Sequence, residues 1–204
     1  MTPFTTVTGV AAALPTPNID TDVIMPKQFL KRIDRAGLAI GAFHDLRFDT
    51  DGQTRPDFVL NRAPYNQAKF LICGDNFGCG SSREYAVWGL QQLGIRAIIA
   101  PSISGIFFGN CEKNGLLAIT LPPGDVDLLM AHADTPRTAL MTIDLDAQTI
   151  TAGPLRIGFD IPAARKALLL SGADHIQQTL DRAATITEFE AKQAATRHWL
   201  WARG

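Results

Sequence analysis

The sequence lacks the features of secreted, membrane-spanning and nucleic-acid-binding chains. Its 204 residues carry 19 Lys and Arg against 20 Asp and Glu, without a basic run, so charge favours neither nucleic acid nor a membrane surface as partner. No window approaches the roughly 18 apolar residues that a helix needs to cross a bilayer. The N-terminus has no basic region before its short apolar patch, unlike a signal peptide.

Cysteine is scarce, with only Cys73, Cys79 and Cys111 in the chain. The odd number and the lack of a secretory start predict a reducing compartment, and we expect the cytoplasm. The spacings between these cysteines match no iron–sulfur pattern, so we expect no cofactor or metal bound by this chain itself.

The length predicts one domain over residues 1–204, with a helical extension from about residue 161. Apolar runs bounded by Gly or Pro predict strands at 5–13, 69–73, 95–100 and 116–120. Helical patterns lie between the later strands, at 81–94 and 104–114, and each ends on Gly. This alternation is typical of an α/β fold with a parallel core sheet and helical crossovers.

Other segments show different patterns. After residue 137, β-branched residues alternate with turn formers and predict an antiparallel hairpin. A short helix is expected near Pro26, and a loop at 44–57. The sequence also predicts helices at 162–182 and 187–201, the latter capped by Thr187 with Glu190.

The stretch GDNFGCGSSRE, residues 74–84, follows a predicted strand and precedes a predicted helix. Ligands of open α/β sheets bind at this end of the strands, and a helix N-terminus attracts anions. A capping box formed by Ser81 and Glu84 would explain those two residues without chemistry, but not Ser82 or Arg83. An arginine at this place is better suited to hold a carboxylate or phosphate.

Other functional patterns are missing around this stretch. It has neither the GK[ST] ending of a phosphate-binding loop nor the third glycine of a dinucleotide-binding loop. It is not a G-x-S-x-G nucleophile elbow, and none of the four histidines lies in a recognisable motif. Residues 18–22, NIDTD, fit either an ordinary turn or a source of carboxylates near the serine loop.

Three stretches in order resemble the small subunits of 3-isopropylmalate dehydratase, in the aconitase superfamily: NIDTDVIMPKQFLKRI, GDNFGCGSSRE and IFFGNCEKNGLLAI. The resemblance implies a swivelling β/β/α domain that forms a separate polypeptide. It also implies a larger partner subunit that holds a [4Fe-4S] cluster on its own cysteines. The implied reaction converts 2-isopropylmalate into 3-isopropylmalate by way of isopropylmaleate, in leucine biosynthesis.

The same resemblance assigns roles to residues of this chain. Ser81 matches the general base, and Ser82 and Arg83 match residues that bind a substrate carboxylate. Thr21 and Asp22, of the Asp-Thr-Asp motif, are expected to line the same substrate site. A segment that reads the side group of the substrate is expected at Phe29, Leu30, Lys31 and Arg32.

Two positions depart from the family pattern. Tyr85 replaces a histidine, and Gly89 replaces an alanine in the following helix. These departures leave open a related enzyme for another 2-hydroxy diacid, such as 2-methylmalate or a dimethylmalate. A non-catalytic anion-binding module is a further alternative. Trp199 and Trp201, at the C-terminal end, could fold back onto the domain or contact the large subunit.

Overall fold

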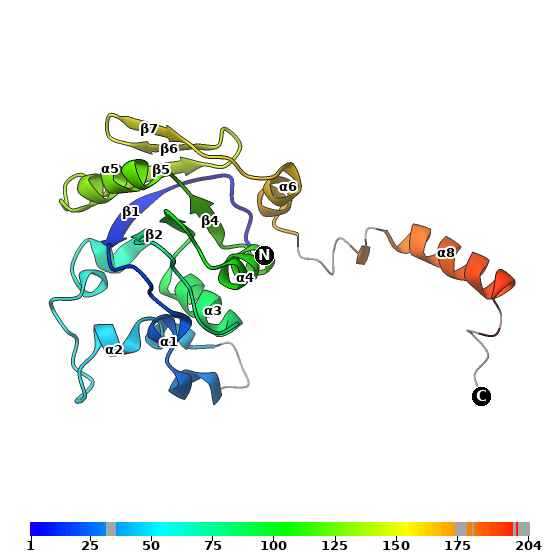
Figure 1. Cartoon of the computed structure of the whole chain (residues 1–204), viewed down its shortest axis with the longest axis horizontal. Coiled ribbons are helices and arrows are strands. Elements are labelled where there is room, and N and C mark those ends of the chain that lie inside the picture. The colour runs from blue at the N-terminus through cyan, green and yellow to red at the C-terminus, as the bar shows by residue number, and fades with distance from the viewer. Residues whose placement is uncertain (32–35, 174–178, 181, 198, 200–204) are drawn as a thin grey trace. The chain divides into compact units, whose positions relative to one another are not determined.

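The structure, a computed structural model, describes residues 1–31, 36–173, 179–180, 182–197 and 199. By its internal contacts the chain divides into two compact units, Met1–Gly172 and Ala173–Gly204. The first unit contains a seven-stranded mixed sheet with the strand order β4-β3-β2-β1-β5-β6-β7 (Figure 1).

The parallel half of the sheet consists of the strands β1 (Thr6–Leu14), β2 (Ala68–Cys73), β3 (Ala97–Ala100) and β4 (Leu117–Thr120). All four predicted strands are therefore confirmed, within a few residues. In the register Leu14 lies opposite Cys73, and Ala100 lies opposite Thr120. The carboxyl ends of these strands consequently meet at one edge of the sheet, and their loops leave the sheet side by side.

The antiparallel half consists of β5 (Leu140–Asp144), β6 (Thr149–Ala152) and β7 (Leu155–Gly158), and β5 pairs with β1. The hairpin expected after residue 137 is thus a three-stranded meander. Its second turn contains Gly153, with a φ of 57°, a backbone conformation that suits glycine. The α/β fold with a parallel core and an antiparallel portion is confirmed.

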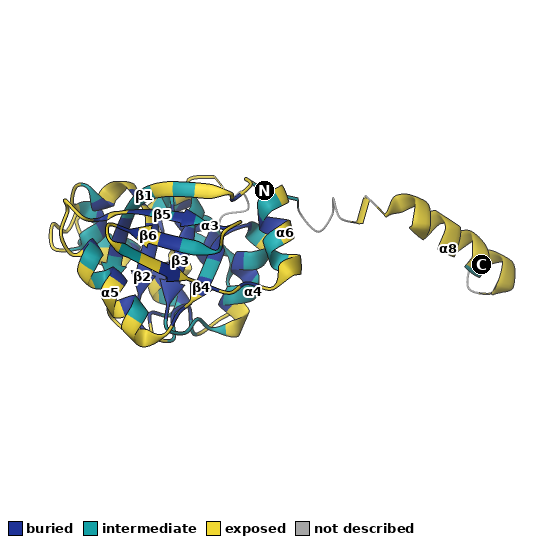
Figure 2. Ribbon diagram, turned by 90° about the horizontal axis from the view of Figure 1, so that it is seen from above, coloured by how far each residue is buried: buried dark blue, intermediate teal, exposed yellow. Residues whose placement is uncertain are grey.

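Two apolar clusters lie on opposite faces of the parallel half of the sheet, because successive strand residues point to opposite sides. Leu71 and Cys73 of β2 belong to one cluster, together with residues of α3 (Glu84–Leu93) and α4 (Gly105–Asn114). Phe70 and Ile72 belong to the other, together with residues of α5 (Pro123–Ala133) and α6 (Ala163–Ser171). Figure 2 shows the buried residues concentrated along the central strands.

Short helical turns connect β1 to β2. They are α1 (Thr21–Ile24), η1 (Lys27–Lys31), η2 (Leu38–Ile40), α2 (His44–Arg47), η3 (Val59–Asn61) and η4 (Tyr65–Gln67), where η denotes a 3-10 helix. The short helix expected near Pro26 is confirmed as η1. The expectation of a loop throughout 44–57 is wrong at its start, where Arg47 N–H donates to the Phe43 carbonyl and closes the turn of α2.

The helix predicted over 162–182 does not continue past residue 171, and residues 174–178 and 181 of that prediction lie outside the described residues. Helix α6 ends at Ser171, because Gly172 adopts a left-handed conformation with a φ of 67° and closes the helix. The predicted last helix begins earlier than expected, as α8 (Ala183–Thr196). Thr187 lies inside it and donates its hydroxyl to the Ala183 carbonyl, so the predicted cap with Glu190 is wrong.

Helix α8 belongs to the second unit, and none of its residues is buried (Figure 2). Trp199 follows it and is also exposed, whereas the expectations for Trp201 lie outside the described residues. Over the described ranges, no helix has both the length and the apolar character needed to cross a membrane.

Candidate active site

Two segments lie against each other at the carboxyl edge of the parallel strands: the acidic turn, residues 18–22 after β1, and the site loop, residues 74–83 after β2. Three main-chain hydrogen bonds join them: Asn18 N–H to Asp75 O (2.8 Å), Gly78 N–H to Ile19 O (2.8 Å) and Thr21 N–H to Cys79 O (2.9 Å). The pairing gives the site loop a fixed neighbour that is about sixty residues away in the sequence.

The segment after β3 holds the other side of the site loop. Phe77 N–H donates to the Ser102 carbonyl at 3.2 Å, and Ser104 N–H donates to the Phe77 carbonyl at 2.9 Å. The Ser102 hydroxyl donates to the Asp75 carboxylate at 2.5 Å and accepts from Asn76 N–H at 2.9 Å. Sequence reasoning missed Ser102, since only the parallel register brings it to the loop.

Left-handed backbone conformations gather in these two segments. Asn18 and Asn76 have φ values of 58° and 54°, and the Asn76 side chain donates to the Asn18 side chain at 2.8 Å. Asparagine tolerates this conformation better than most residues. Gly78 has a φ of 73°, and a Cβ atom there would lie 2.3 Å from the Phe107 ring. Glycine at this position therefore lets the site loop approach α4 closely.

The serines of the site loop lie outside the helix that follows. Helix α3 begins at Glu84, and its N-cap residue, Arg83, makes no side-chain capping hydrogen bond. The alternative explanation of Ser81 and Glu84 as a capping box therefore does not hold. The Ser81 N–H, which such a box would bind to Glu84, donates instead to the Thr21 hydroxyl of the acidic turn. Both Ser81 and Ser82 are exposed at the surface.

Arg83 and Asp22 form an ion pair between the site loop and the acidic turn. The Arg83 side chain is 12% exposed and that of Asp22 is 43% exposed. The hydrogen bond from Arg83 lowers the pKa of the Asp22 carboxyl below its ordinary value, an effect that burial opposes. Asp22 is therefore ionised at neutral pH, and it fixes the position of the guanidinium.

The acidic turn has its own internal support. Asp20 caps α1 by accepting from the Val23 N–H at 2.8 Å. The Thr21 hydroxyl accepts from the Ser81 N–H at 3.1 Å and donates to the Ser81 carbonyl at 3.0 Å. Of the predicted site residues, Thr21 is thus hydrogen-bonded to Ser81, and Arg83 is hydrogen-bonded to Asp22.

The predicted specificity segment follows on η1. Phe29 and Leu30 are half-buried and pack against the apolar cluster beneath α3, whereas Lys31 is exposed. The Phe29 ring lies 4.9 Å from the His44 ring, measured between centroids. Arg32 lies outside the described residues.

The two residues that depart from the family pattern both serve packing. Tyr85 is half-buried, with its ring centroid 4.8 Å from that of Trp88. A Cβ atom on Gly89 would lie 2.2 Å from the Met25 methyl group. Gly89 therefore lets Met25 pack directly against α3, and alanine would require Met25 to move.

The described residues offer no group of three His, Cys, Asp or Glu side chains that could hold a metal ion. Cys73 and Cys111 are fully buried in the core, and burial raises the pKa of both thiols. Both thiols are therefore protonated at neutral pH in the chain without a bound metal.

Histidine offers Ser81 no hydrogen-bonded base within the described part of the chain. His44 pairs with Asp45 at 3.0 Å, and His132 lies 3.4 Å from the Leu140 carbonyl. Both rings thus have partners elsewhere. Ser81 is therefore not part of a Ser–His–Asp arrangement built from these residues.

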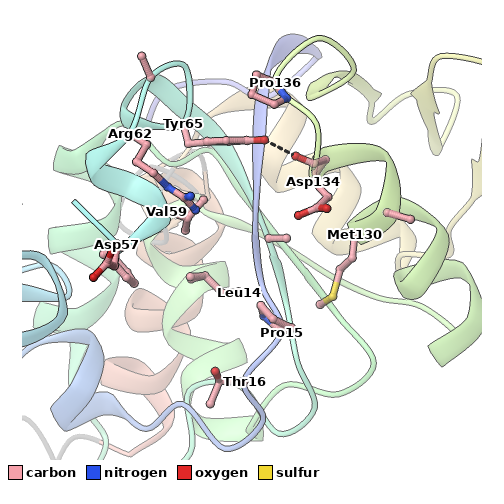
Figure 3. A pocket seen from close by; sticks show the side chains of 15 residues that line it. Leu14, Pro15, Thr16, Asp57, Val59, Arg62, Tyr65, Met130, Asp134 and Pro136 are labelled. Atoms are coloured by element: carbon pink, nitrogen blue, oxygen red, sulfur yellow. Dashed lines mark hydrogen bonds between the residues drawn. The ribbon is translucent and has the colours of Figure 1, made fainter. Parts of the chain in front are cut away.

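A cavity of about 660 Å³ lies elsewhere, between the end of β1, the turns η3 and η4, and the end of α5 (Figure 3). The Tyr65 hydroxyl donates to the Ala133 carbonyl at 2.7 Å beside it. None of the predicted site residues lines this cavity. Ser81 and Ser82 are instead exposed at the surface.

Comparison with known proteins shows the class of domain to which the chain belongs. Residues 1–124 match the family model of the aconitase C-terminal domain. This match covers both the acidic turn and the site loop. A crystal structure of 3-isopropylmalate dehydratase (LeuD) from Methanocaldococcus jannaschii has a similar fold, with a TM-score of 0.65 and 25% sequence identity. The alignment covers 90% of this chain and 99% of that chain.

Curated relatives narrow the class to one family. Proteins named 3-isopropylmalate dehydratase small subunit from Jannaschia sp. and Dinoroseobacter shibae are 51% and 50% identical to this chain. Another protein of that name, from Roseobacter denitrificans, is 48% identical. Each alignment covers 98% of this chain and the whole of the relative. The chain belongs to the family of 3-isopropylmalate dehydratase small subunits.

Proposed function

We propose that the chain is the small subunit of a heteromeric hydro-lyase that isomerises 2-isopropylmalate to 3-isopropylmalate by way of isopropylmaleate, in leucine biosynthesis. The observation that carries the proposal is the match, over the whole length, with relatives of that name. The site geometry suits the reaction, because an exposed serine and a fixed arginine lie at the carboxyl edge of a parallel sheet.

Ser81 is the proposed general base, which takes the carbon-bound proton of the substrate. A free hydroxyl is far too weak a base at neutral pH, so its deprotonated form must be stabilised. Ser81 lies just before the N-terminus of the ten-residue helix α3, whose N-cap residue, Arg83, makes no side-chain capping hydrogen bond. Helix N–H groups and the nearby Arg83 guanidinium can supply that stabilisation once water is excluded.

Arg83 and Ser82 are the proposed ligands of a substrate carboxylate. Asp22 hydrogen-bonds only Nη1 of Arg83, and a guanidinium has five N–H donors. Among the described residues no other hydrogen bond to this guanidinium is found, so its remaining donors can hold a carboxylate of the substrate in bidentate fashion. Asp22 lines the site from the side of the guanidinium and keeps Arg83 in place, and Ser82 contributes a neighbouring hydroxyl.

The proposed partner is a large subunit that carries a [4Fe-4S] cluster. The described residues contain no group of three His, Cys, Asp or Glu that could hold a metal ion, and Ser81 and Ser82 are exposed at the surface, where a partner could cover them. When bound in the partner, the cluster would supply Lewis-acid activation of the hydroxyl that leaves the substrate. This chain would supply the base, the carboxylate ligands and a surface that closes over the substrate.

The proposed specificity segment is Phe29 to Arg32, on and after η1. Tyr85, which raised the alternative of another 2-hydroxy diacid, packs its ring against Trp88. We retain 2-isopropylmalate as substrate because the relatives that match over the whole length carry the name of that enzyme. The free cysteines support the cytoplasm as the working location.

The proposal is tested by expressing the chain with the cluster-binding large subunit under anaerobic conditions. We expect the complex to convert 2-isopropylmalate, with isopropylmaleate followed by its absorbance, and each subunit alone to be inactive. Faster turnover of 2-methylmalate would identify a related dehydratase instead. A complex that binds diacids but converts none would favour the anion-binding module.

A further inference from the structure

We propose that Thr21 is the positioning residue of Ser81, and not a ligand of the substrate; this rests on the proposed function of Ser81 as the base. One hydroxyl group binds both main-chain polar groups of the same serine. It accepts from the Ser81 N–H at 3.1 Å and donates to the Ser81 carbonyl at 3.0 Å. The contact therefore fixes the main chain on both sides of the Ser81 Cα atom.

Burial excludes a role for Thr21 in direct contact with a diacid. Thr21 is 1% exposed, whereas Ser81 and Asp22 reach the surface. A hydroxyl has one proton to donate, and that of Thr21 is given to the Ser81 carbonyl. It consequently has no proton left for a substrate carboxylate, and a carboxylate cannot reach it without unfolding the turn.

Thr21 is itself held firmly, as a positioning residue must be. Its N–H donates to the Cys79 carbonyl at 2.9 Å, and its carbonyl accepts from the Met25 N–H at 3.0 Å. Gly80 turns the site loop around the hydroxyl with a φ of 92°, and a Cβ atom there would lie 3.4 Å from the Thr21 oxygen. The hydroxyl thus sits inside a turn whose shape glycine permits.

The consequence concerns the direction of the Ser81 side chain. The Cα–Cβ direction follows from the main chain, and the preceding glycines leave the loop many other conformations. Without the hydroxyl, the serine oxygen would sample positions away from the substrate proton. Misplacement of a reacting group by about 1 Å can lower the rate about 100-fold. We therefore expect kcat to fall while KM changes little.

Two matched pairs of variants test the hydroxyl in the complex with the large subunit. In the first pair, wild type and Thr21→Val, the side chains at residue 21 have nearly the same shape. In the second pair, Thr21→Ser and Thr21→Ala, both side chains are smaller. Only the first member of each pair has the hydroxyl. We expect loss of the hydroxyl to lower kcat by about 10- to 100-fold in each pair, with KM within about twofold. Thr8→Val, which removes a hydroxyl bonded to Thr142 on the strands, is the control and should keep wild-type kcat.

Hydrogen exchange of the Ser81 amide, measured on the full-chain small subunit, gives a second readout. We expect faster exchange in Thr21→Ala than in Thr21→Ser, confined to the site loop. Wild-type kcat in Thr21→Val, or equal kcat in the Ser and Ala variants, would overturn the inference while leaving the proposed function intact. If Thr21→Val does not fold, the Ser and Ala pair decides. An inactive wild-type complex would instead refute the proposed function, and the exchange result would still decide whether Thr21 positions Ser81.

Discussion

The parallel and antiparallel halves of the sheet share one domain, but only the parallel half carries candidate chemistry. Strands β1 to β4 run in one direction, so the acidic turn, the site loop and the segment after β3 leave the same edge and bind one another. Strands β5 to β7 are joined by turns of a few residues, and no predicted site residue lies on them. Parallel pairing brings together residues far apart in sequence, as with Thr21 and Ser81, which short hairpin turns cannot do.

The largest loss of stability is expected from a substitution in the core of the antiparallel half. Ile150 of β6 is fully buried and pairs in register with Ile143 and Ile157. We expect Ile150→Ala to lower the free energy of unfolding by about 2–5 kcal/mol, because it leaves a cavity in the core. Urea denaturation of the full chain measures this loss. The kcat and KM of the assembled complex should stay unchanged, and a change in KM would contradict the separation of the two halves.

Replacement of the site arginine should affect activity instead. Arg83→Lys keeps the positive charge but loses the planar fork that holds a carboxylate by two hydrogen bonds. We expect kcat/KM for 2-isopropylmalate to fall about 10- to 100-fold, the cost of one such charged hydrogen bond, mainly through KM. Steady-state kinetics measure it, with Arg156→Lys on the exposed part of β7 as the control. Equal kinetics in the two variants would count against the role of Arg83.

Two glycine variants separate the effect of close packing in the site loop on stability from the effect of its left-handed backbone conformation. Gly78 and Gly52 have similar φ values of 73° and 77°. A Cβ atom on Gly78 would lie 2.3 Å from the Phe107 ring, whereas a Cβ atom on Gly52 would have no neighbour within 4 Å. We expect the free energy of unfolding of Gly78→Ala to be lower than that of Gly52→Ala by about 1–3 kcal/mol, because the added methyl group forces the site loop away from α4. Thermal or urea unfolding of both variants provides the comparison. Equal losses would show that the contact with Phe107 is not important.

The smallest effect concerns acid stability. Arg83 lowers the pKa of Asp22 from its ordinary value of 3.8, so the stabilising contribution of the pair is complete above that pH. It is lost as the pH falls through the lowered pKa. We expect wild type to lose more unfolding free energy than Asp22→Asn between pH 7 and pH 3, by less than about 1 kcal/mol, since the pair is partly exposed.

Asp144, in the antiparallel half, is the matched control for that measurement. Its pKa is also lowered, first by a hydrogen bond from the Ala147 N–H and then by one from the Thr6 hydroxyl. Asp144→Asn should therefore reduce the acid sensitivity of unfolding in the same direction. Only Asp22→Asn should also raise KM, and a similar KM in the two variants would show that Asp22 does not support substrate binding.

The sequence predicted the parallel half well, because its strands are continuous apolar runs that end at glycine or proline. Helix α5 was not predicted, although Pro123 at its start and the spacing of Val126, Leu129 and Ala133 are typical of an amphipathic helix. The start of α3 was misplaced because Ser-x-x-Glu is a local capping signal, and no local rule reports that Ser81 is held from sixty residues away. That the acidic turn and the site loop form one site was predicted from the resemblance to a family, and not from the spacing of their residues.

The proposal that this chain supplies the base of a shared active site is tested most directly by Ser81→Ala in the assembled complex. We expect the variant to assemble and to bind 2-isopropylmalate with nearly wild-type affinity, because Arg83 and Ser82 remain. Turnover should fall by about 10²- to 10⁴-fold, the usual contribution of a general base. Thr8→Val, which removes a hydroxyl on the strands away from the site loop, should keep wild-type turnover. A Ser81→Ala complex that keeps wild-type turnover would contradict the assignment of the base to this chain.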